Sequence, residues 1–428
     1  MRKFFISIFL FFIFLMPARS QDYNNFFQNK AFRIDFQLCG DEKTTTAWLH
    51  QLSEEPFWGG RRAQLSTDLN LGQNRIQVFD SLSNQLIYTD GFSTLYFEWQ
   101  TTPEAKLMKK CFEQTVQIPF PKKAVKINID KRKGFDSWET LLSFNVSPED
   151  KLIRRNQLPK VPVREILKPA SPDKAVDIVV IAEGYTAAEQ EKFFEDAARL
   201  ADHLFTHEPF IKYRNRINVY AVAAVSEQSG ISMPHKDNWL NTAVRSHYYT
   251  FYSPRYLTSP ATFSIRDYAA LVPYDAIYVL ANTPEYGGGG IYNFYAFASA
   301  GSKRAQAEVV VHEFGHSFAG LGDEYFYDSD VLDGMYNLTE EPWEPNITSL
   351  VNFDTKWKNM LPKGTPIPTP VTDENKTVGI GVFEGGGYLT KGMYRPSYDC
   401  RMRTNDAKAF CPVCEKAVEK VILHLTEK

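Results

Sequence analysis

The sequence lacks an excess of charge of either sign. It has 48 lysine and arginine residues against 51 aspartate and glutamate residues, and its formal net charge is −3 at pH 7. Long basic runs are missing as well. Nucleic-acid-binding domains usually carry a basic face, because they must neutralise a phosphate backbone. We therefore expect no nucleic-acid partner.

Long apolar segments are missing too, except at the N-terminus. There an apolar run over residues 4–16 follows Arg2 and Lys3 and precedes small residues. A helix needs roughly 20 apolar residues to cross a bilayer, so this run is too short to span one. Its layout is typical of a secretory signal peptide. We expect a signal over residues 1–20 cleaved near Ser20, no membrane span, and a secreted protein that is extracellular, cell-surface or periplasmic.

Cysteine is scarce, with five residues in the whole chain. Cys411 and Cys414 have a spacing found in zinc and redox sites, but only Cys400 is nearby to complete a ligand set. A disulfide between Cys400 and either of them is the favoured prediction for an exported protein. A disulfide between Cys39 and Cys111 is a second prediction. One thiol is then left over.

The first part of the mature chain has the pattern of a β-sandwich. Apolar and polar residues alternate over residues 32–38, and short strand-like runs follow at close spacing up to residue 146. Such spacing favours an antiparallel sandwich, which we assign to residues 21–150. Residues 151–174 contain four prolines among charged residues and are predicted to be an extended linker.

From residue 175 to residue 428 the pattern becomes that of an α/β domain. Residues 175–182 form a continuous apolar run, which is typical of a strand buried on both faces. Thr186 and Glu189 then form a capping box at the start of a helix. Further strands are predicted at residues 217–225, 276–281 and 291–298, and a helix from about residue 303 to 318, with Ser302 as its cap. The fold class is therefore α+β, in two domains.

The chemistry is concentrated on that last helix. His312 and His316 are four residues apart, so they lie on one helix face, where two imidazoles can hold one zinc ion. Glu313 lies beside that face, within reach of a zinc-bound water whose proton it can take as general base. The surrounding helix is apolar, and buried histidines beside a carboxylate are costly unless a cation compensates them. We predict one catalytic Zn²⁺ here.

A zinc hydrolase needs a third protein ligand and an open position. In metzincin peptidases this ligand is a histidine ten residues after the first, but Gly322 occupies that place here. Asp323 follows directly, as if one residue were inserted, and aspartate is a competent zinc ligand. We predict Asp323 as the third ligand, with Glu324 as the alternative.

With this motif, the sequence resembles the IgA-peptidase family of secreted bacterial zinc metallopeptidases, which are metzincin-like enzymes with a β-rich N-terminal domain. The resemblance extends over nearly the whole mature chain. Matching segments besides the metal motif are residues 69–72, 97–102, 364–370, 394–396, 399–403 and 410–414.

The resemblance implies a metzincin-like catalytic domain in which Met402 lies under the zinc. It also implies that residues 291–298 form the edge strand along which an extended peptide pairs. Four tyrosines are weaker candidates for stabilising the oxyanion, and His235 and His247 are more typical of surface or structural residues. The four are Tyr325, Tyr388, Tyr394 and Tyr398.

Together these features predict a secreted zinc-dependent endopeptidase that hydrolyses protein or peptide substrates, with immunoglobulin or another host glycoprotein as examples. One alternative is a zinc hydrolase acting on a non-peptide amide. Another is a secreted binding or adhesion protein whose peptidase-like domain is ancillary or inactive. The intact Glu313 argues against an inactive domain, because a binding protein has no use for the base. The sequence does not determine the oligomeric state.

Overall fold

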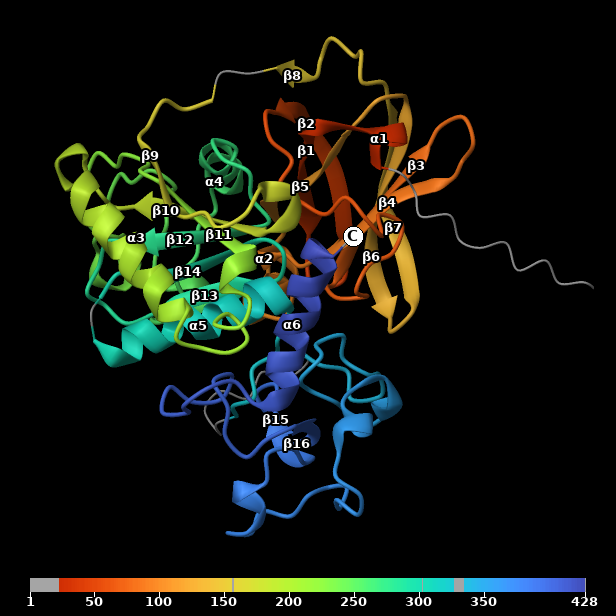
Figure 1. Ribbon diagram of the computed structural model, residues 1–428, viewed down its shortest axis with the longest axis vertical. Coiled ribbons are helices and arrows are strands. Elements are labelled where there is room, and N and C mark those ends of the chain that lie inside the picture. Colours follow the sequence, from red (N-terminus) through yellow and green to blue (C-terminus); the bar gives the residue numbers. More distant parts are fainter. Residues whose placement is uncertain (1–22, 156–157, 302, 327–334, 428) are drawn as a thin grey trace, which may run out of the picture.

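The computed structural model describes residues 23–155, 158–301, 303–326 and 335–427. The predicted signal peptide and Ser302 lie outside these residues. A β-rich N-terminal part lies beside an α/β part, and the last helix, α6 (Pro412–Thr426), runs next to both (Figure 1). The α+β class with a separate N-terminal domain is confirmed.

The N-terminal domain consists of two four-stranded sheets around one core. One sheet has the order β5-β1-β2-β8 and the other β4-β3-β6-β7. Alternate residues such as Ile34, Ile76 and Ile127 point from both sheets into the core, which explains the alternation in the sequence. Two short helices accompany the sheets, α1 (Tyr23–Phe26) and α2 (Leu95–Gln100). The strands are β1 (Phe27–Gly40), β2 (Thr45–Glu55), β3 (Asn74–Asp80), β4 (Leu86–Phe92), β5 (Lys110–Pro121), β6 (Val125–Gly134), β7 (Ser137–Val146) and β8 (Arg154–Arg155).

The two cysteine predictions have different outcomes. Cys39 and Cys111 face each other across β1 and β5 and form a disulfide, as predicted. The predicted C-terminal disulfide was wrong, because Cys400, Cys411 and Cys414 are all free and buried. Cys400 Sγ lies 3.8 Å from Cys414 Sγ, well beyond the bond length of about 2.05 Å.

The second domain is built on one six-stranded sheet with the order β13-β14-β12-β10-β11-β9. The four inner strands are parallel to one another, and every residue of β10 is buried, as its continuous apolar run predicted. β9 lies within the predicted linker and pairs with β11 at one edge. The strands are β9 (Val163–Leu167), β10 (Val176–Glu183), β11 (Ile217–Val222), β12 (Ala276–Ala281), β13 (Gly288–Ile291) and β14 (Tyr295–Ser299).

Helices pack on or beside this sheet. The capping box of Thr186 and Glu189 is confirmed: it precedes α3 (Gln190–Leu204). The predicted helix near residue 303 is α5 (Arg304–Ala319), and α3 and α5 pack against each other. α4 (Thr262–Ala269) lies in the segment that the sequence left unassigned. A small hairpin of β15 (Phe383–Gly386) and β16 (Leu389–Arg395) follows before α6.

The predicted edge strand over residues 291–298 was wrong in its position. Asn293 has a φ of +49°, so the chain turns there and makes a hairpin of β13 and β14. β13, with its three glycines, is the edge strand, and β14 lies inside the sheet. The outer side of Gly288 already exchanges backbone hydrogen bonds with Arg255 and Leu257. The edge is therefore not free along its whole length for an added peptide.

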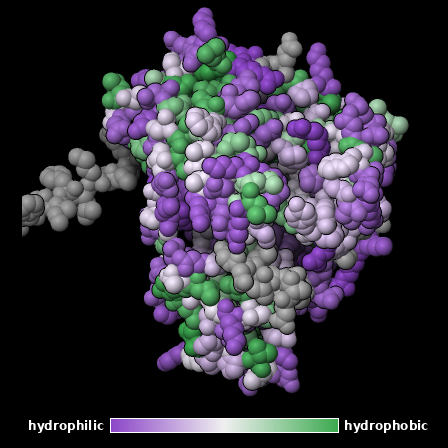
Figure 2. Space-filling model, turned by 180° about the vertical axis from the view of Figure 1, so that it is seen from behind, coloured by the Kyte–Doolittle hydropathy of each residue, from purple (hydrophilic) through white to green (hydrophobic). Residues whose placement is uncertain are grey.

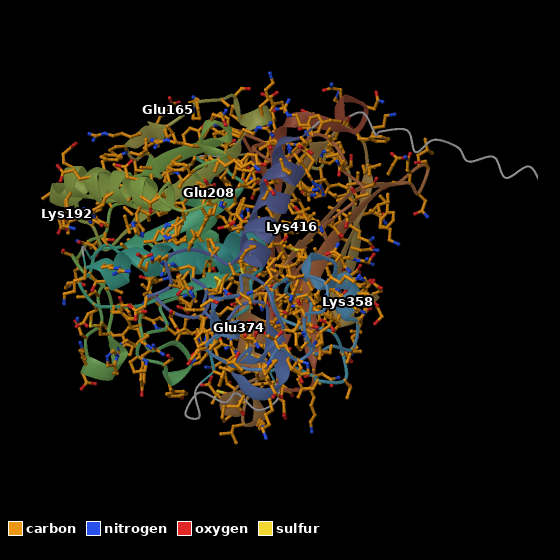
Figure 3. The ribbon with its side chains drawn as sticks, turned by 60° about the horizontal axis from the view of Figure 1, so that its bottom comes forward. Glu165, Lys192, Glu208, Lys358, Glu374 and Lys416 are labelled. Atoms are coloured by element: carbon orange, nitrogen blue, oxygen red, sulfur yellow. A yellow bond between two sulfur atoms is a disulfide. The ribbon has the colours of Figure 1, made fainter. Side chains whose placement is uncertain are left out.

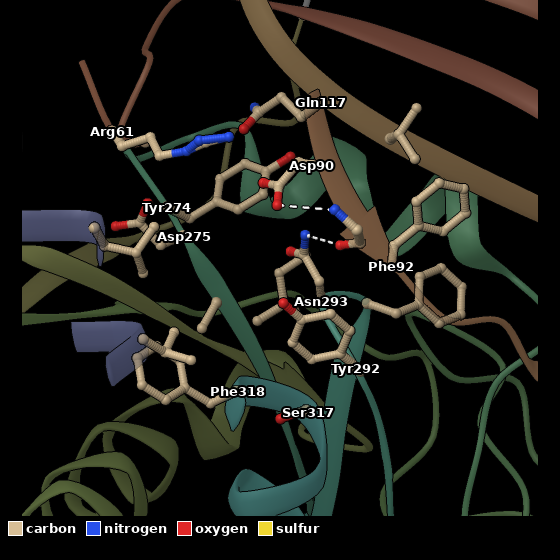
Figure 4. Close-up of a pocket in the computed structure, with 18 of the residues that line it drawn as sticks. Arg61, Asp90, Phe92, Gln117, Tyr274, Asp275, Tyr292, Asn293, Ser317 and Phe318 are labelled. Atoms are coloured by element: carbon tan, nitrogen blue, oxygen red, sulfur yellow. Dashed lines mark hydrogen bonds between the residues drawn. The ribbon is translucent and has the colours of Figure 1, made fainter. Parts of the chain in front are cut away.

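The two domains meet in an interface that contains buried charge. Arg33 of β1, whose side chain is 3% exposed, pairs with Asp35 at 2.7 Å and with Asp267 of α4 at 2.6 Å. A cavity of about 90 Å³ lies between the domains and is lined by residues of both, including Asp90 and Asn293 (Figure 4). Asn293 donates a hydrogen bond to the Gly91 carbonyl at 2.8 Å across this boundary. Specific polar contacts therefore fix the N-terminal domain against the second domain.

The face seen from behind is mainly polar (Figure 2). Charged side chains such as Lys192 on α3 and Lys416 on α6 point outward (Figure 3). On the face seen from behind, hydrophobic residues occur in small patches among hydrophilic ones (Figure 2). Among the described residues, no helix has the length and hydropathy needed to cross a membrane.

Candidate metal centre

The helix α5 carries His312, Glu313 and His316 directly against the edge strand β13. A Cβ atom at Gly290 would lie 2.3 Å from the carbonyl oxygen of Glu313, so only glycine allows the helix to approach this closely. The ring nitrogens of the histidines and a carboxylate oxygen of Glu313 lie within 4.8 Å of one another. The glycine-rich strand thus brings the helix face with these three residues against the sheet edge.

Three donor atoms converge at one point. His312 Nε2 and His316 Nε2 are 3.1 Å apart. Asp323 Oδ1 lies 3.1 Å from the first and 3.2 Å from the second. Ligands at about 2.0–2.1 Å from a tetrahedral zinc ion are separated by roughly 3.3 Å. The three atoms therefore fit the ligand set of a single zinc ion.

The other ring nitrogens fix the histidine tautomers. His312 Nδ1 lies 3.0 Å from the Arg401 carbonyl oxygen, and His316 Nδ1 lies 2.5 Å from the Leu321 carbonyl oxygen. Because a carbonyl only accepts, each Nδ1 must carry the hydrogen, and in the neutral ring Nε2 then presents a lone pair. Both lone pairs face each other and the Asp323 carboxylate. This arrangement is typical of metal-binding histidines held by backbone carbonyls.

The chain returns to the histidines because α5 ends sharply. Gly320 adopts a φ of +62°, the conformation preferred just beyond a helix end. The side chain of Asn346 then holds Gly322 through two hydrogen bonds of 2.7 and 2.9 Å. This turn brings Asp323 to the histidines, and the Tyr388 hydroxyl donates to its Oδ2. Glu324, the alternative from the sequence, points away to a separate buried cluster.

The electrostatics of the metal-free site favour a cation. Burial lowers the pKa of His316, but the nearby Asp323 outweighs this effect and raises it to about 9. Burial raises the pKa of Asp323, but the two histidines bring it well below its usual range. Burial also raises the pKa of Glu313. A proton or a metal ion between these groups therefore stabilises the site.

Two family profiles match most of the chain. The profile of IgA Peptidase M64 matches residues 165–378 and 371–422, and that of the Peptidase M64 N-terminus matches residues 22–143. The chain belongs to the IgA peptidase M64 family. The resemblance stated from the sequence is thereby confirmed, and the family membership makes the chain a peptidase with protein substrates. No curated protein matches it.

In this M64 peptidase, Met402 packs against α5, the helix that carries His312 and His316, and its place under a zinc ion stays a prediction from the resemblance. Met402 is fully buried, and its Sδ would be 2.7 Å from a Cβ at Gly315, which lies between the two histidines in sequence. Its carbonyl oxygen accepts a hydrogen bond from the Glu324 backbone amide at 2.8 Å. Met402 therefore supports the helix and the turn that follows it.

The structure separates the four tyrosine candidates of the M64 peptidase. Tyr388 bonds to Asp323, and the Tyr325 ring stacks 6.3 Å from the His312 ring. Tyr394 pairs through its backbone with Thr348, and Tyr398 packs against Phe383. The first two border the metal centre. His235 and His247 make their contacts with other parts of the chain.

One residue at the site was missed by the sequence reasoning. Glu98, from α2 of the N-terminal domain, accepts a hydrogen bond from the Tyr256 hydroxyl and interacts electrostatically with His316. Burial raises the pKa of Glu98 to about 7. The segment over residues 97–102 was part of the family resemblance, and that was the signal that could have identified it. In this M64 peptidase the N-terminal domain therefore borders the candidate metal centre.

Proposed function

We propose that the chain is a secreted, zinc-dependent endopeptidase with a metzincin-like catalytic domain. The observation that carries the proposal is the convergence of the His312, His316 and Asp323 donor atoms at 3.1–3.2 Å. The histidine side chains are mostly buried and Asp323 is buried. Lone pairs and a carboxylate this close together are unfavourable there unless a cation lies among them. Three protein ligands also leave a fourth position open, which a catalytic zinc requires.

His312, His316 and Asp323 would hold the ion. When bound, zinc polarises a carbonyl oxygen and lowers the pKa of water. The backbone carbonyls of Arg401 and Leu321 keep the two imidazoles in the tautomer that binds, and Tyr388 orients the Asp323 carboxylate.

Glu313 is the general base of the proposed reaction. It accepts a proton from the attacking water and later passes it to the leaving amine of the cleaved peptide. Burial raises its pKa, which brings the carboxylate closer to the range where one group can both accept and return a proton. Its position one residue from His312 keeps it beside the reacting atoms.

The substrate is a protein. The family name refers to IgA, so immunoglobulins and other host glycoproteins are the first substrates to test. Export of the enzyme fits the signal-like residues 1–20 and the Cys39–Cys111 disulfide, because disulfides persist in oxidising compartments.

The proposal is tested with the purified chain on casein and on IgA. Hydrolysis should stop after zinc is removed by a chelator and return when zinc is added back. The variant His316→Ala should lose both the catalytic metal and hydrolysis, whereas His247→Ala, outside the site, should keep both. Undiminished hydrolysis by metal-stripped protein would refute the proposal.

A further inference from the structure

A second cluster of metal-binding groups lies behind the catalytic centre. It consists of Glu324, Cys400, Cys411 and Cys414, whose ligand atoms lie within 4.8 Å of one another. All four residues are buried, and the three cysteines are free thiols. Cys411 and Cys414 flank the start of α6, whereas Glu324 follows Asp323 directly. The proposed peptidase reaction uses none of these four side chains.

The carboxylate of Glu324 needs a cation that the described residues do not supply directly. Its Oε1 accepts from Asn346 Nδ2 at 2.9 Å and from Cys414 Sγ at 3.1 Å. Its Oε2 is buried and has no hydrogen-bond partner among the described residues. A fully buried carboxylate that is not paired costs several kcal/mol. A disulfide among the cysteines would not remove this cost.

The sulfur geometry fits a metal better than a disulfide. Cys400 Sγ and Cys414 Sγ are 3.8 Å apart, and two sulfurs bound at about 2.3 Å to a tetrahedral zinc ion are separated by roughly 3.8 Å. The Cys411 backbone amide donates to Cys400 Sγ at 3.2 Å, an interaction that stabilises a thiolate. A redox role is disfavoured, because a redox pair must be accessible and Cys411 is only 5% exposed.

We propose that Cys400, Cys411, Cys414 and Glu324 bind a second Zn²⁺, which is structural. Binding releases a proton from each of the three thiols, and the three thiolates and one carboxylate complete a four-coordinate shell. No position is left open for water or substrate, which distinguishes this site from the catalytic one. A third cluster, of His203, His207 and Glu308, is not proposed, because Arg401 already supplies the cation there.

The second zinc would hold the parts that support the catalytic centre. Cys400 precedes Arg401, whose carbonyl oxygen fixes His312, and Glu324 follows Asp323. The Glu324 amide also bonds to the Met402 carbonyl oxygen. One ion therefore connects α6, the chain at residues 400–402 and the turn at residues 323–324. We expect its loss to weaken the catalytic site without removing any catalytic ligand.

The test is the zinc content of the purified full chain, prepared without reducing agent, by mass spectrometry of the metal. The wild type should contain about two zinc ions per chain, and Cys414→Ser and His316→Ala about one each. With cobalt in place of zinc, the sulfur-to-metal charge-transfer band should remain in His316→Ala and be absent from Cys414→Ser. This band reports the second site independently of peptidase activity.

A thiol count on the wild type keeps the test decisive if Cys414→Ser does not fold. After unfolding with a chelator, about three thiols per chain should react with iodoacetamide, and zinc should be released with them. A single reactive thiol would mean a disulfide and would overturn the proposal. Three reactive thiols with only one zinc ion in the native chain would overturn it as well.

Discussion

Replacing Tyr388 by phenylalanine should weaken zinc binding at the catalytic centre without changing its shape. The hydroxyl donates to Asp323 Oδ2, which leaves Oδ1 facing both histidines. The ring itself packs 5.3 Å from the Tyr325 ring, and phenylalanine retains that contact. The substitution therefore removes one hydrogen bond that orients a metal ligand.

Losing such an orienting group usually lowers metal affinity about 10–100-fold, which corresponds to about 1.4–2.7 kcal/mol. The zinc dissociation constant can be measured by competition with a chromophoric chelator. Tyr398→Phe is the matched control, because that ring packs against Phe383 outside the site. Zinc affinity of folded Tyr388→Phe within twofold of the wild type would refute the reasoning that Tyr388 positions Asp323 as a ligand.

Three further predictions concern the N-terminal domain and its interface. Arg33→Ala should lower the unfolding free energy by about 3–5 kcal/mol in denaturant titrations, because it leaves buried carboxylates unpaired. The control Arg155→Ala, which removes an exposed ion pair, should lower it by at most about 1 kcal/mol. Replacing Cys39 and Cys111 by serine should cost about 2–4 kcal/mol in the same assay, since the bridge joins residues 72 apart; no change would mean that the bridge is absent in solution. In the folded protein the pKa of Glu98 is raised from 4.5 to about 7. The free energy of unfolding therefore falls as the pH rises between these two values, because Glu98 ionises more readily in the unfolded chain. Glu98→Gln should therefore raise the melting temperature of chelator-treated protein more at pH 8 than at pH 5, and an equal change at both would contradict this.

The helix over residues 304–319 and the approach of its two histidines were predictable because both depend on local spacing. Two histidines four residues apart must share a helix face, and Glu313 must lie beside it. The strands followed from alternation and from the continuous apolar run of β10 in the same way. These features need no knowledge of the rest of the chain.

Other features depend on how distant segments meet. Asp323 rather than Glu324 lies beside the two histidines because Asn346 holds the turn from 24 residues away. Glu98 reaches the site only because the two domains pack together, and no local pattern shows that. The strand at residues 291–298 was misplaced because a single left-handed residue, Asn293, divides it.

The C-terminal disulfide prediction was wrong for a similar reason, because the deciding contact joins distant segments. From the sequence, Cys400, Cys411 and Cys414 lacked a fourth ligand, so a disulfide was the simpler prediction. Glu324 lies 76 residues before Cys400 and reaches the cluster only through the turn after α5. Glu324, the alternative ligand predicted for the catalytic site, is thus the residue that completes the proposed second zinc site.

The central claim is that Glu313 is the base beside a zinc ion held by His312, His316 and Asp323. It is tested most directly by measuring bound zinc and peptide hydrolysis on the same preparation of Glu313→Gln. The account predicts the full wild-type zinc content with hydrolysis reduced by about 10²–10⁴-fold. Hydrolysis close to the wild-type rate at full zinc content would contradict it.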